Sequence, residues 1–271
     1  MTTPTLRAAS GTPDTSELYA SSKVPQVTAA FWIVKIFATT VGETGGDALS
    51  MTLKLGYVVS TLIFVAFFAI TLTAQVKSSR YHPVYYWLVV VATTTVGTTT
   101  SDMLDRTLKL GYVKSSIIEL ALVILVLVAW HRSTGSIAVD TITTRKNEIF
   151  YWLTILVSNT LGTALGDFVA TDAGLGFERG ALVFAALLAL VVVLYFFTSI
   201  SNSVLFWAAY VLTRPLGATL GDLLTKPRAD GGLNFGRITS SLILAAGMTL
   251  LIATTSLRHR APRSLSATAH W

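Results

Sequence analysis

One residue pattern occurs four times along the chain: a tryptophan is followed ten residues later by glycine and fifteen residues later by aspartate. The surrounding stretches are apolar enough to cross a bilayer, which places each aspartate inside a membrane span. An intramembrane carboxylate is costly and usually faces a bundle interior or a water-filled cavity. The repeated acids are therefore a candidate functional site. The four sets are Trp32/Gly42/Asp47, Trp87/Gly97/Asp102, Trp152/Gly162/Asp167 and Trp207/Gly217/Asp222.

Composition is typical of a membrane protein. The 271 residues are 52% hydrophobic and 13% charged, about half the charged share of soluble domains. Apolar runs of roughly 20 residues, the length that spans the hydrocarbon core, recur along nearly the whole chain. We predict an all-α integral membrane protein with eight transmembrane helices. They are expected at residues 27–50, 57–76, 84–104, 111–131, 149–170, 180–200, 203–224 and 237–256.

The repeat spacing predicts the architecture. The tryptophans lie 55, 65 and 55 residues apart, so the four units form two pairs with a polar linker between them. Two spans per unit give every copy the same orientation, which predicts four parallel helix hairpins with internal pseudo-symmetry. The expected segments are a disordered tail, repeats 1 and 2, the linker, repeats 3 and 4, and a basic tail, at residues 1–26, 27–132, 133–147, 148–257 and 258–271.

Further strings relate the units to one another. Residues 52–58 and 107–113 are both TLKLGYV, residues 161–167 and 216–222 share LGxxLGD, and LGY or LGF begins the second helix of the first three units. With the tryptophan pattern, this arrangement resembles an uncharacterised bacterial membrane family built from four tandem copies of a repeat of unknown function. The resemblance covers roughly Phe31 to Ser256. It implies an eight-helix inner-membrane protein and brings no settled activity.

Charge predicts the orientation. Ten Lys/Arg residues fall on the side that holds both termini and eight on the other, so the positive-inside rule favours cytoplasmic termini for a multi-pass protein of the bacterial inner (plasma) membrane. The net charge of +6 is explained by basic loops beside lipid, and no nucleic-acid partner is expected. The expected partners are the lipid bilayer and a small cation or proton, and a homo-oligomer is left open.

The glycines have two interpretations. Small residues four positions apart let helix backbones approach closely in lipid. Glycine also permits a helix break that exposes carbonyl oxygens beside the carboxylate. Helix packing and helix break both stay open for Gly42, Gly46, Gly97, Gly162, Gly166, Gly217 and Gly221.

Three charged residues break the symmetry of the units. Glu43 is unique to the first unit, Lys35 lies eight residues before it, and Arg214 lies eight residues before Asp222. Cations inside a membrane need partners. We therefore predict that Lys35 pairs with an acid of another helix and that Arg214 pairs with Asp222 or Asp167, both acting as internal counter-charges.

The tryptophans are predicted to lie at the membrane interface. Each follows a phenylalanine or tyrosine, and paired aromatic residues at helix ends are typical of interfacial belts. This prediction covers Trp32, Trp87, Trp152 and Trp207.

Ligand chemistry narrows the function. The chain has no cysteine, and its four histidines lie in predicted loops, at the last residue of one span (His131) or in the tail, so we expect no thiolate or imidazole at membrane depth. Carboxylate, hydroxyl and carbonyl oxygens suit protons and hard cations such as Mg²⁺, Ca²⁺, Mn²⁺ or Na⁺. We predict a proton-coupled secondary transporter of a hard cation, with a divalent metal such as manganese among the candidates. The ion- or proton-binding residues are expected to be Asp47, Asp102, Asp167, Asp222 and Glu43.

Other functions are weighed against this prediction. A cation channel fits the near-fourfold repetition but not the buried cations Lys35 and Arg214, and a membrane protein with purely structural aspartates is the second alternative. An enzyme is not expected, because four equivalent carboxylates exceed the pair that an aspartic protease needs and no Ser/His or Cys/His arrangement lies in the membrane. No cofactor is expected, and the identity of any metal stays open.

Overall fold

The computed structural model describes residues 23–139 and 142–260. The predicted N-terminal tail falls largely on residues 1–22, and most of the predicted C-terminal tail on residues 261–271, which lie outside this range. The described part of the chain forms eight long helices, which correspond to the eight apolar stretches. They are α2 (Ala29–Asp47), α3 (Gly56–Lys77), α4 (Pro83–Asp102), α5 (Tyr112–Thr134), α6 (Arg145–Asp167), α7 (Gly176–Phe197), α8 (Asn202–Thr225) and α9 (Arg237–Arg260).

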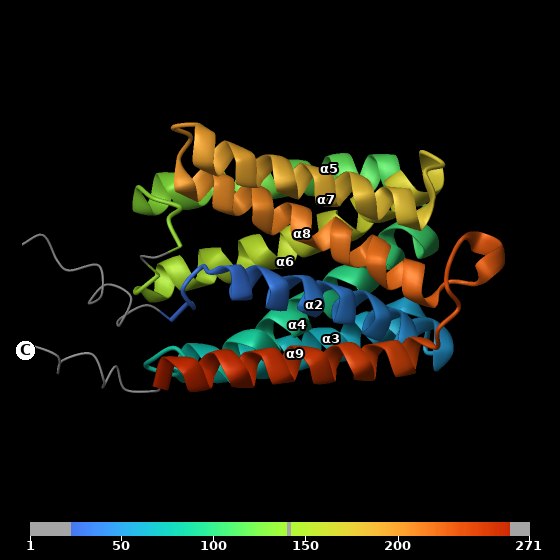
Figure 1. Cartoon of the computed structure of the whole chain (residues 1–271), viewed down its shortest axis with the longest axis horizontal. Coiled ribbons are helices and arrows are strands. Elements are labelled where there is room, and N and C mark those ends of the chain that lie inside the picture. The colour runs from blue at the N-terminus through green and yellow to red at the C-terminus, as the bar shows by residue number, and fades with distance from the viewer. Residues whose placement is uncertain (1–22, 140–141, 261–271) are drawn as a thin grey trace, which may run out of the picture.

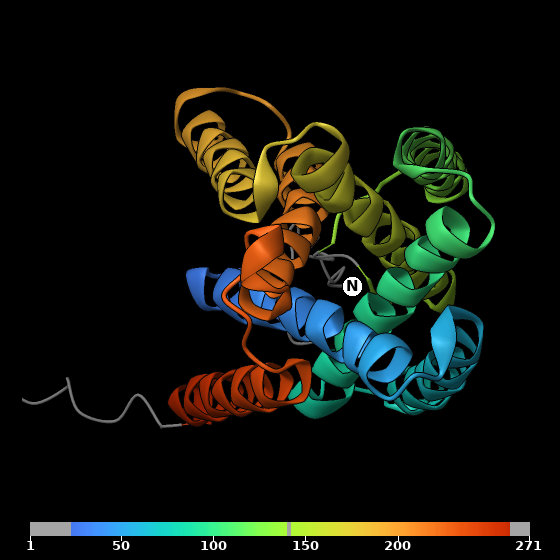
Figure 2. The same ribbon diagram turned by 90° about the vertical axis from the view of Figure 1, so that its right-hand side faces the viewer.

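The first helices of the four repeats form a closed inner ring. α2 packs against α4, α4 against α6, α6 against α8, and α8 returns to α2. Figure 2 shows this ring end-on, and Figure 1 shows its helices running in the same direction along the bundle. These helices carry the tryptophans, glycines and aspartates of the repeats. The predicted parallel arrangement of the repeats is therefore present.

The second helices stand outside the ring, each against the inner helix of the next repeat. α3 packs on α4, α5 on α6, α7 on α8, and α9 closes the cycle on α2. The two helices of one hairpin are therefore splayed apart, and each hairpin depends on its neighbour for burial. An isolated repeat lacks the partner that covers its outer helix.

Five of the described helices are long and apolar enough to cross a membrane. They include all four outer helices, whose apolar side chains are largely exposed, as at Leu62, Ile117, Phe197 and Leu242. The inner helices α2, α4 and α8 fall below that apolarity because their polar faces line the interior of the ring. The polar residues are thus kept away from the lipid-facing surface.

Close helix contacts explain the glycines. A Cβ atom on Gly42 would overlap Thr94 of α4, one on Gly162 would overlap Arg214 of α8, and one on Gly217 would overlap Thr39 of α2. On α4, a Cβ on Gly97 would lie 2.8 Å from the carbonyl carbon of Asn159. All four helices continue unbroken through these positions. Glycine therefore serves packing at these four positions, and no helix break occurs at them.

Hydroxyls complete these contacts between neighbouring inner helices. Thr94 Oγ1 donates to the Ala38 carbonyl at 3.2 Å, and Thr39 Oγ1 donates to the Thr213 carbonyl at 3.1 Å. Without side chains on the facing glycines, threonine reaches the backbone of the next helix. Such polar contacts add specificity where apolar burial cannot hold helices together in lipid.

Each aspartate of the first three repeats is followed directly by a short π-helical segment. These segments are η1 (Ala48–Thr52), η2 (Met103–Thr107) and η3 (Phe168–Asp172). In the fourth repeat α8 continues to Thr225, and a three-residue insertion adds the 3₁₀ turn η4 (Arg228–Asp230). The fourth connection therefore differs in shape from the other three.

The LGY and LGF strings start the outer helices through a left-handed backbone. Gly56, Gly111 and Gly176 have φ of +74°, +77° and +74°, a region that glycine enters without steric cost. Two residues earlier in each connection, Lys54, Lys109 and Gly174 also have positive φ, and Asn234 takes this place in the fourth repeat with φ of +60°. Asparagine tolerates this conformation better than most residues.

Most of the tryptophans are core residues. Trp87, Trp152 and Trp207 are between 2% and 5% exposed, and Trp207 Nε1 donates to the Ile137 carbonyl at 3.0 Å. They pack edge-on or tilted against the aromatic residues beside them in the sequence and on neighbouring helices. These three tryptophans therefore face the interior of the ring, while Trp32 is half-buried. Their place at the membrane interface stays a prediction.

The glycine contacts make a testable prediction. Gly42→Ala forces α2 and α4 apart, and overpacking of this kind costs about 1–3 kcal/mol, so thermal unfolding of the purified protein should begin at a lower temperature. Gly45→Ala is the matched control on the same helix, because the nearest atoms to its Cβ lie 4.0 Å away. Equal stability of the two variants would contradict the packing role.

Candidate functional site

The inner helices bury a stack of layers inside the ring. Residues four apart share one face of a helix, and the face that starts just before each tryptophan is buried throughout. We name each layer after its distinctive residue. The aromatic layer is Phe31, Tyr86, Tyr151 and Phe206; the lysine layer is Lys35, Val90, Ile155 and Tyr210; the arginine layer is Thr39, Thr94, Asn159 and Arg214; the glutamate layer is Glu43, Thr98, Thr163 and Ala218; the aspartate layer is Asp47, Asp102, Asp167 and Asp222.

Arg214 links all four inner helices. From α8, its Nη2 atom donates to Glu43 Oε2 of α2 at 2.9 Å, to Thr98 Oγ1 of α4 at 2.6 Å and to Thr163 Oγ1 of α6 at 2.6 Å. Gly162 leaves room for the Cβ and Cγ atoms of Arg214, and the Arg214 side chain is 0% exposed. Arg214 therefore fills the fourth place of the glutamate layer.

The predicted partner of Arg214 needs correction. Arg214 forms an ion pair with Glu43, not with Asp222 or Asp167. The Arg214 side chain does not run along α8 toward Asp222. It points into the ring and reaches Glu43 on the adjacent helix α2. The spacing of Arg214 and Asp222 on α8 did not contain this information.

Lys35 has a different environment from the one predicted. Its Nζ atom lies 4.1 Å from the centre of the Tyr210 ring and 3.5 Å from Asn159 Oδ1. Among the described residues it forms no ion pair with a carboxylate, so the predicted pairing with an acid of another helix is wrong. Lys35 is nevertheless completely buried.

The aspartate layer is divided into two pairs by cations that the sequence prediction missed. Arg106 bonds Asp102 at 2.9 Å and approaches Asp167 at 3.5 Å. Lys226 occupies the equivalent place in the fourth repeat and bonds Asp222 at 3.0 Å and Asp47 at 3.1 Å. Each cation thus bridges the aspartate of its own repeat to that of the next.

A signal for these two cations was present in the sequence. Arg106 and Lys226 each follow an aspartate by four residues, the spacing that brings side chains together on a helix. The first and third repeats have Met51 and Thr171 at this place. Because this cation occurs in every second repeat, the charge pattern has approximate twofold symmetry, whereas the backbone has approximate fourfold symmetry.

The neighbouring carboxylates favour the charged form of Lys226. Burial lowers its pKa, but the carboxylates of Asp222 and Asp47 raise it by more, so the pKa of Lys226 lies above that of an ordinary lysine. Its side chain is 12% exposed, so it lies between the buried acids and the surface. Asp47 receives a second cation in Arg237, whose Nε atom lies 3.3 Å from Oδ2.

Three carboxylates converge between α2 and α8. One oxygen each from Glu43, Asp47 and Asp222 lies within 4.8 Å of the others, and all three side chains are buried. This arrangement offers the all-oxygen ligands that hard divalent cations prefer. Asp102 and Asp167 belong to the same layer but stand apart from this group, with Arg106 between them.

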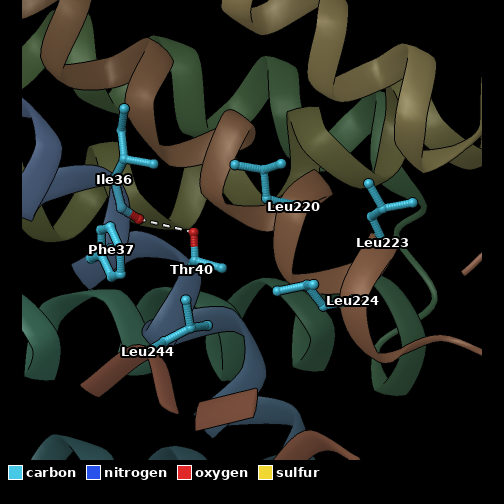
Figure 3. A pocket seen from close by; sticks show the side chains of 7 residues that line it. All are labelled: Ile36, Phe37, Thr40, Leu220, Leu223, Leu224 and Leu244. Carbon is cyan, nitrogen blue, oxygen red and sulfur yellow. Dashed lines mark hydrogen bonds between the residues drawn. The ribbon is translucent and has the colours of Figure 1, made fainter. Parts of the chain in front are cut away.

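The cavity drawn in Figure 3 has a different character. It encloses about 180 Å³ between α2, α8 and α9, and leucine, isoleucine and phenylalanine side chains line most of it. Its one polar side chain, Thr40, donates its hydroxyl to the Ile36 carbonyl at 2.9 Å. The cavity therefore offers no ligand for an ion.

These features define a class of protein: a helical bundle of four tandem repeats with apolar outer helices and a buried charged interior. A family model described as Repeat of Unknown Function (DUF347) matches residues 30–81, 85–136, 150–201 and 205–261. The chain belongs to this family, and each match contains one inner and one outer helix. The comparisons found no match among curated proteins and none among solved structures.

The buried ion pair makes a prediction about stability. Arg214→Met leaves Glu43 as an uncompensated buried charge, and removal of one partner of such a pair costs about 3–5 kcal/mol. The double variant Arg214→Met/Glu43→Gln removes both charges and should recover most of this loss. Thermal unfolding of the single and double variants measures the effect. Additive losses would contradict direct pairing.

Proposed function

We propose that the chain is a secondary transporter of a hard cation, coupled to protons, that crosses the bacterial inner membrane eight times. The five apolar helices are joined in this proposal by α2, α4 and α8, which have similar lengths and lie among them. An even number of spans agrees with the start of α2 and the end of α9 lying at the same end of the bundle. Cytoplasmic termini, inferred from loop charge, complete the proposed topology.

The observation that carries the proposal is the convergence of Glu43, Asp47 and Asp222. Three acids this close repel one another when all are ionised, and a cation or bound protons relieve that repulsion. Mn²⁺, Mg²⁺ and Ca²⁺ favour oxygen ligands of this kind. Glu43 belongs to one repeat alone, which makes the site unequal around the ring.

Lys226 gives the site a means of exchange. It bonds two of the three acids, Asp47 and Asp222, and reaches them from the partly exposed edge of the bundle. A transported cation competes with the lysine ammonium for the same oxygens. In the proposed mechanism Lys226 neutralises the empty site and moves aside when the cation binds, so the acids are never left uncompensated in a low-dielectric environment.

The packing of the ring argues against the alternative of a passive channel. Arg214 lies across the interior and bonds three other helices, and the glycine contacts leave no space for a side chain between neighbouring inner helices. A cation that followed the axis would meet both Arg214 and Lys35. The proposal therefore places the cation at the depth of the aspartates, beside Glu43, Asp47 and Asp222, away from Arg214 and Lys35 along the axis.

Flux measurements test the proposal. In proteoliposomes, we expect the wild-type protein to transport Mn²⁺ in a reaction driven by a proton gradient. Asp222→Asn should lower the transport rate about tenfold or more, because mutation even of a residue that only supports a metal ligand lowers metal affinity or activity by about 10–100-fold. Asp102→Asn is the matched control, because Arg106 keeps Asp167 as a partner. Equal rates in Asp222→Asn and wild type would refute the site.

Lys226 provides a second prediction. Lys226→Gln removes the competing charge, so Mn²⁺ should bind the purified protein about tenfold more tightly, a change of about 1.4 kcal/mol. Titration calorimetry measures this affinity. Lys114→Gln, on an exposed lysine at the start of α5, controls for a general change in surface charge. Weaker or unchanged binding in Lys226→Gln would show that the lysine does not compete with the cation.

A further inference from the structure

Two completely buried cations lie in the middle of the bundle with too few partners. Lys35 and Arg214 are both 0% exposed. Arg214 uses Nη2 for Glu43 and the two threonines, while its Nε and Nη1 atoms are buried without a hydrogen-bond partner in the part of the chain described. Unpaired buried donors and charges are costly. A bound group that supplies negative charge there would remove this cost.

The two cations are close to each other. Lys35 Nζ lies over the Tyr210 ring, and Tyr210 precedes Arg214 by one helical turn on α8. Asn159, which accepts from Lys35, lies one turn before Gly162, the residue that packs on the Arg214 side chain. A partner between them would serve both.

The charge balance selects the ligand. With Lys35 protonated, Lys35, Arg214 and Glu43 carry two positive charges and one negative charge, so one positive charge is left over for a bound anion to compensate. We propose that a small monovalent anion, of the chemistry of chloride, binds between Lys35 and the unpartnered nitrogens of Arg214. The anion neutralises the remaining charge, and its site lies above the glutamate layer, on the side away from the aspartates.

The surrounding helices limit the size of this anion. The inner helices touch at Gly42, Gly162 and Gly217, where even one methyl group would overlap the next helix. An organic carboxylate or a large oxyanion would have to separate these contacts. Chloride is therefore the probe of choice, and gluconate is the matched anion that is too large. The inference stands whether or not the acids transport a cation.

Thermal unfolding of the purified protein tests the anion site. The protein is first held in sodium gluconate, and sodium chloride replaces it at constant ionic strength. A ligand that binds the folded state raises the unfolding temperature in a saturable manner. Wild type should show this rise, Lys35→Met should lose it, and Lys77→Met, on an exposed lysine of α3, should keep it. A rise of the same size in Lys35→Met, or none in wild type, would overturn the proposal.

Equilibrium binding of radioactive chloride provides a second measurement that does not depend on the folding of Lys35→Met. Wild type should bind one chloride per chain. Glu43→Gln removes the nearby negative charge and should tighten binding about tenfold, because charges interact strongly in a low-dielectric interior. Absence of bound chloride in wild type would mean that water alone serves Arg214 and would overturn the proposal. Unchanged binding in Glu43→Gln would place the chloride elsewhere and overturn it as well.

Discussion

The hydrogen bonds of Arg214 across the ring are the interaction on which the interior of this bundle depends. One guanidinium from α8 binds a carboxylate on α2 and hydroxyls on α4 and α6, so it joins every inner helix at one depth. Burial of such a charge is costly without partners. The glycines make the arrangement possible, because they allow the four helices to approach closely enough for one side chain to reach the other three.

A nearly fourfold backbone carries a charge pattern of lower symmetry. All four repeats place an aspartate at the same depth, but a bridging cation occurs in the second and fourth repeats alone, as Arg106 and Lys226. Glu43 then distinguishes the two halves by adding a third carboxylate beside Asp47 and Asp222. A symmetric backbone thus gives one group of three acids, paired with Arg214, Lys226 and Arg237, and one pair of aspartates that shares Arg106.

The tryptophan–glycine–aspartate register predicted the repeats, the inner helices and the burial of the acids, because identical spacing on parallel helices places equivalent residues at one level. The pairing of helices was not predictable in the same way. Each outer helix packs on the next repeat, and spacing along one chain says nothing about which neighbour lies opposite. The partners of Arg214 and Lys35 were wrong for this reason, since both are set by contacts across the ring.

Burial and ion pairing were only partly predictable, for local physical reasons. The tryptophans resemble an interfacial belt in sequence, and the structure adds that three of them are buried at one end of the ring, where large aromatic side chains pack against one another. Arg106 and Lys226 lie at the ends of apolar stretches and were assigned to loops, although their four-residue spacing from aspartates indicates pairing. Hydropathy locates a helix, whereas charge spacing shows which side chains it brings together.

The central claim is that Glu43, Asp47 and Asp222 hold a cation in place of Lys226. The most direct measurement is a crystal structure of the protein grown with Mn²⁺, with diffraction data collected at the manganese absorption edge. The account predicts an anomalous peak within bonding distance of oxygens from all three acids, with the Lys226 ammonium moved away from Asp47 and Asp222. A peak elsewhere, or none, with Lys226 still bonded to both aspartates, would contradict it.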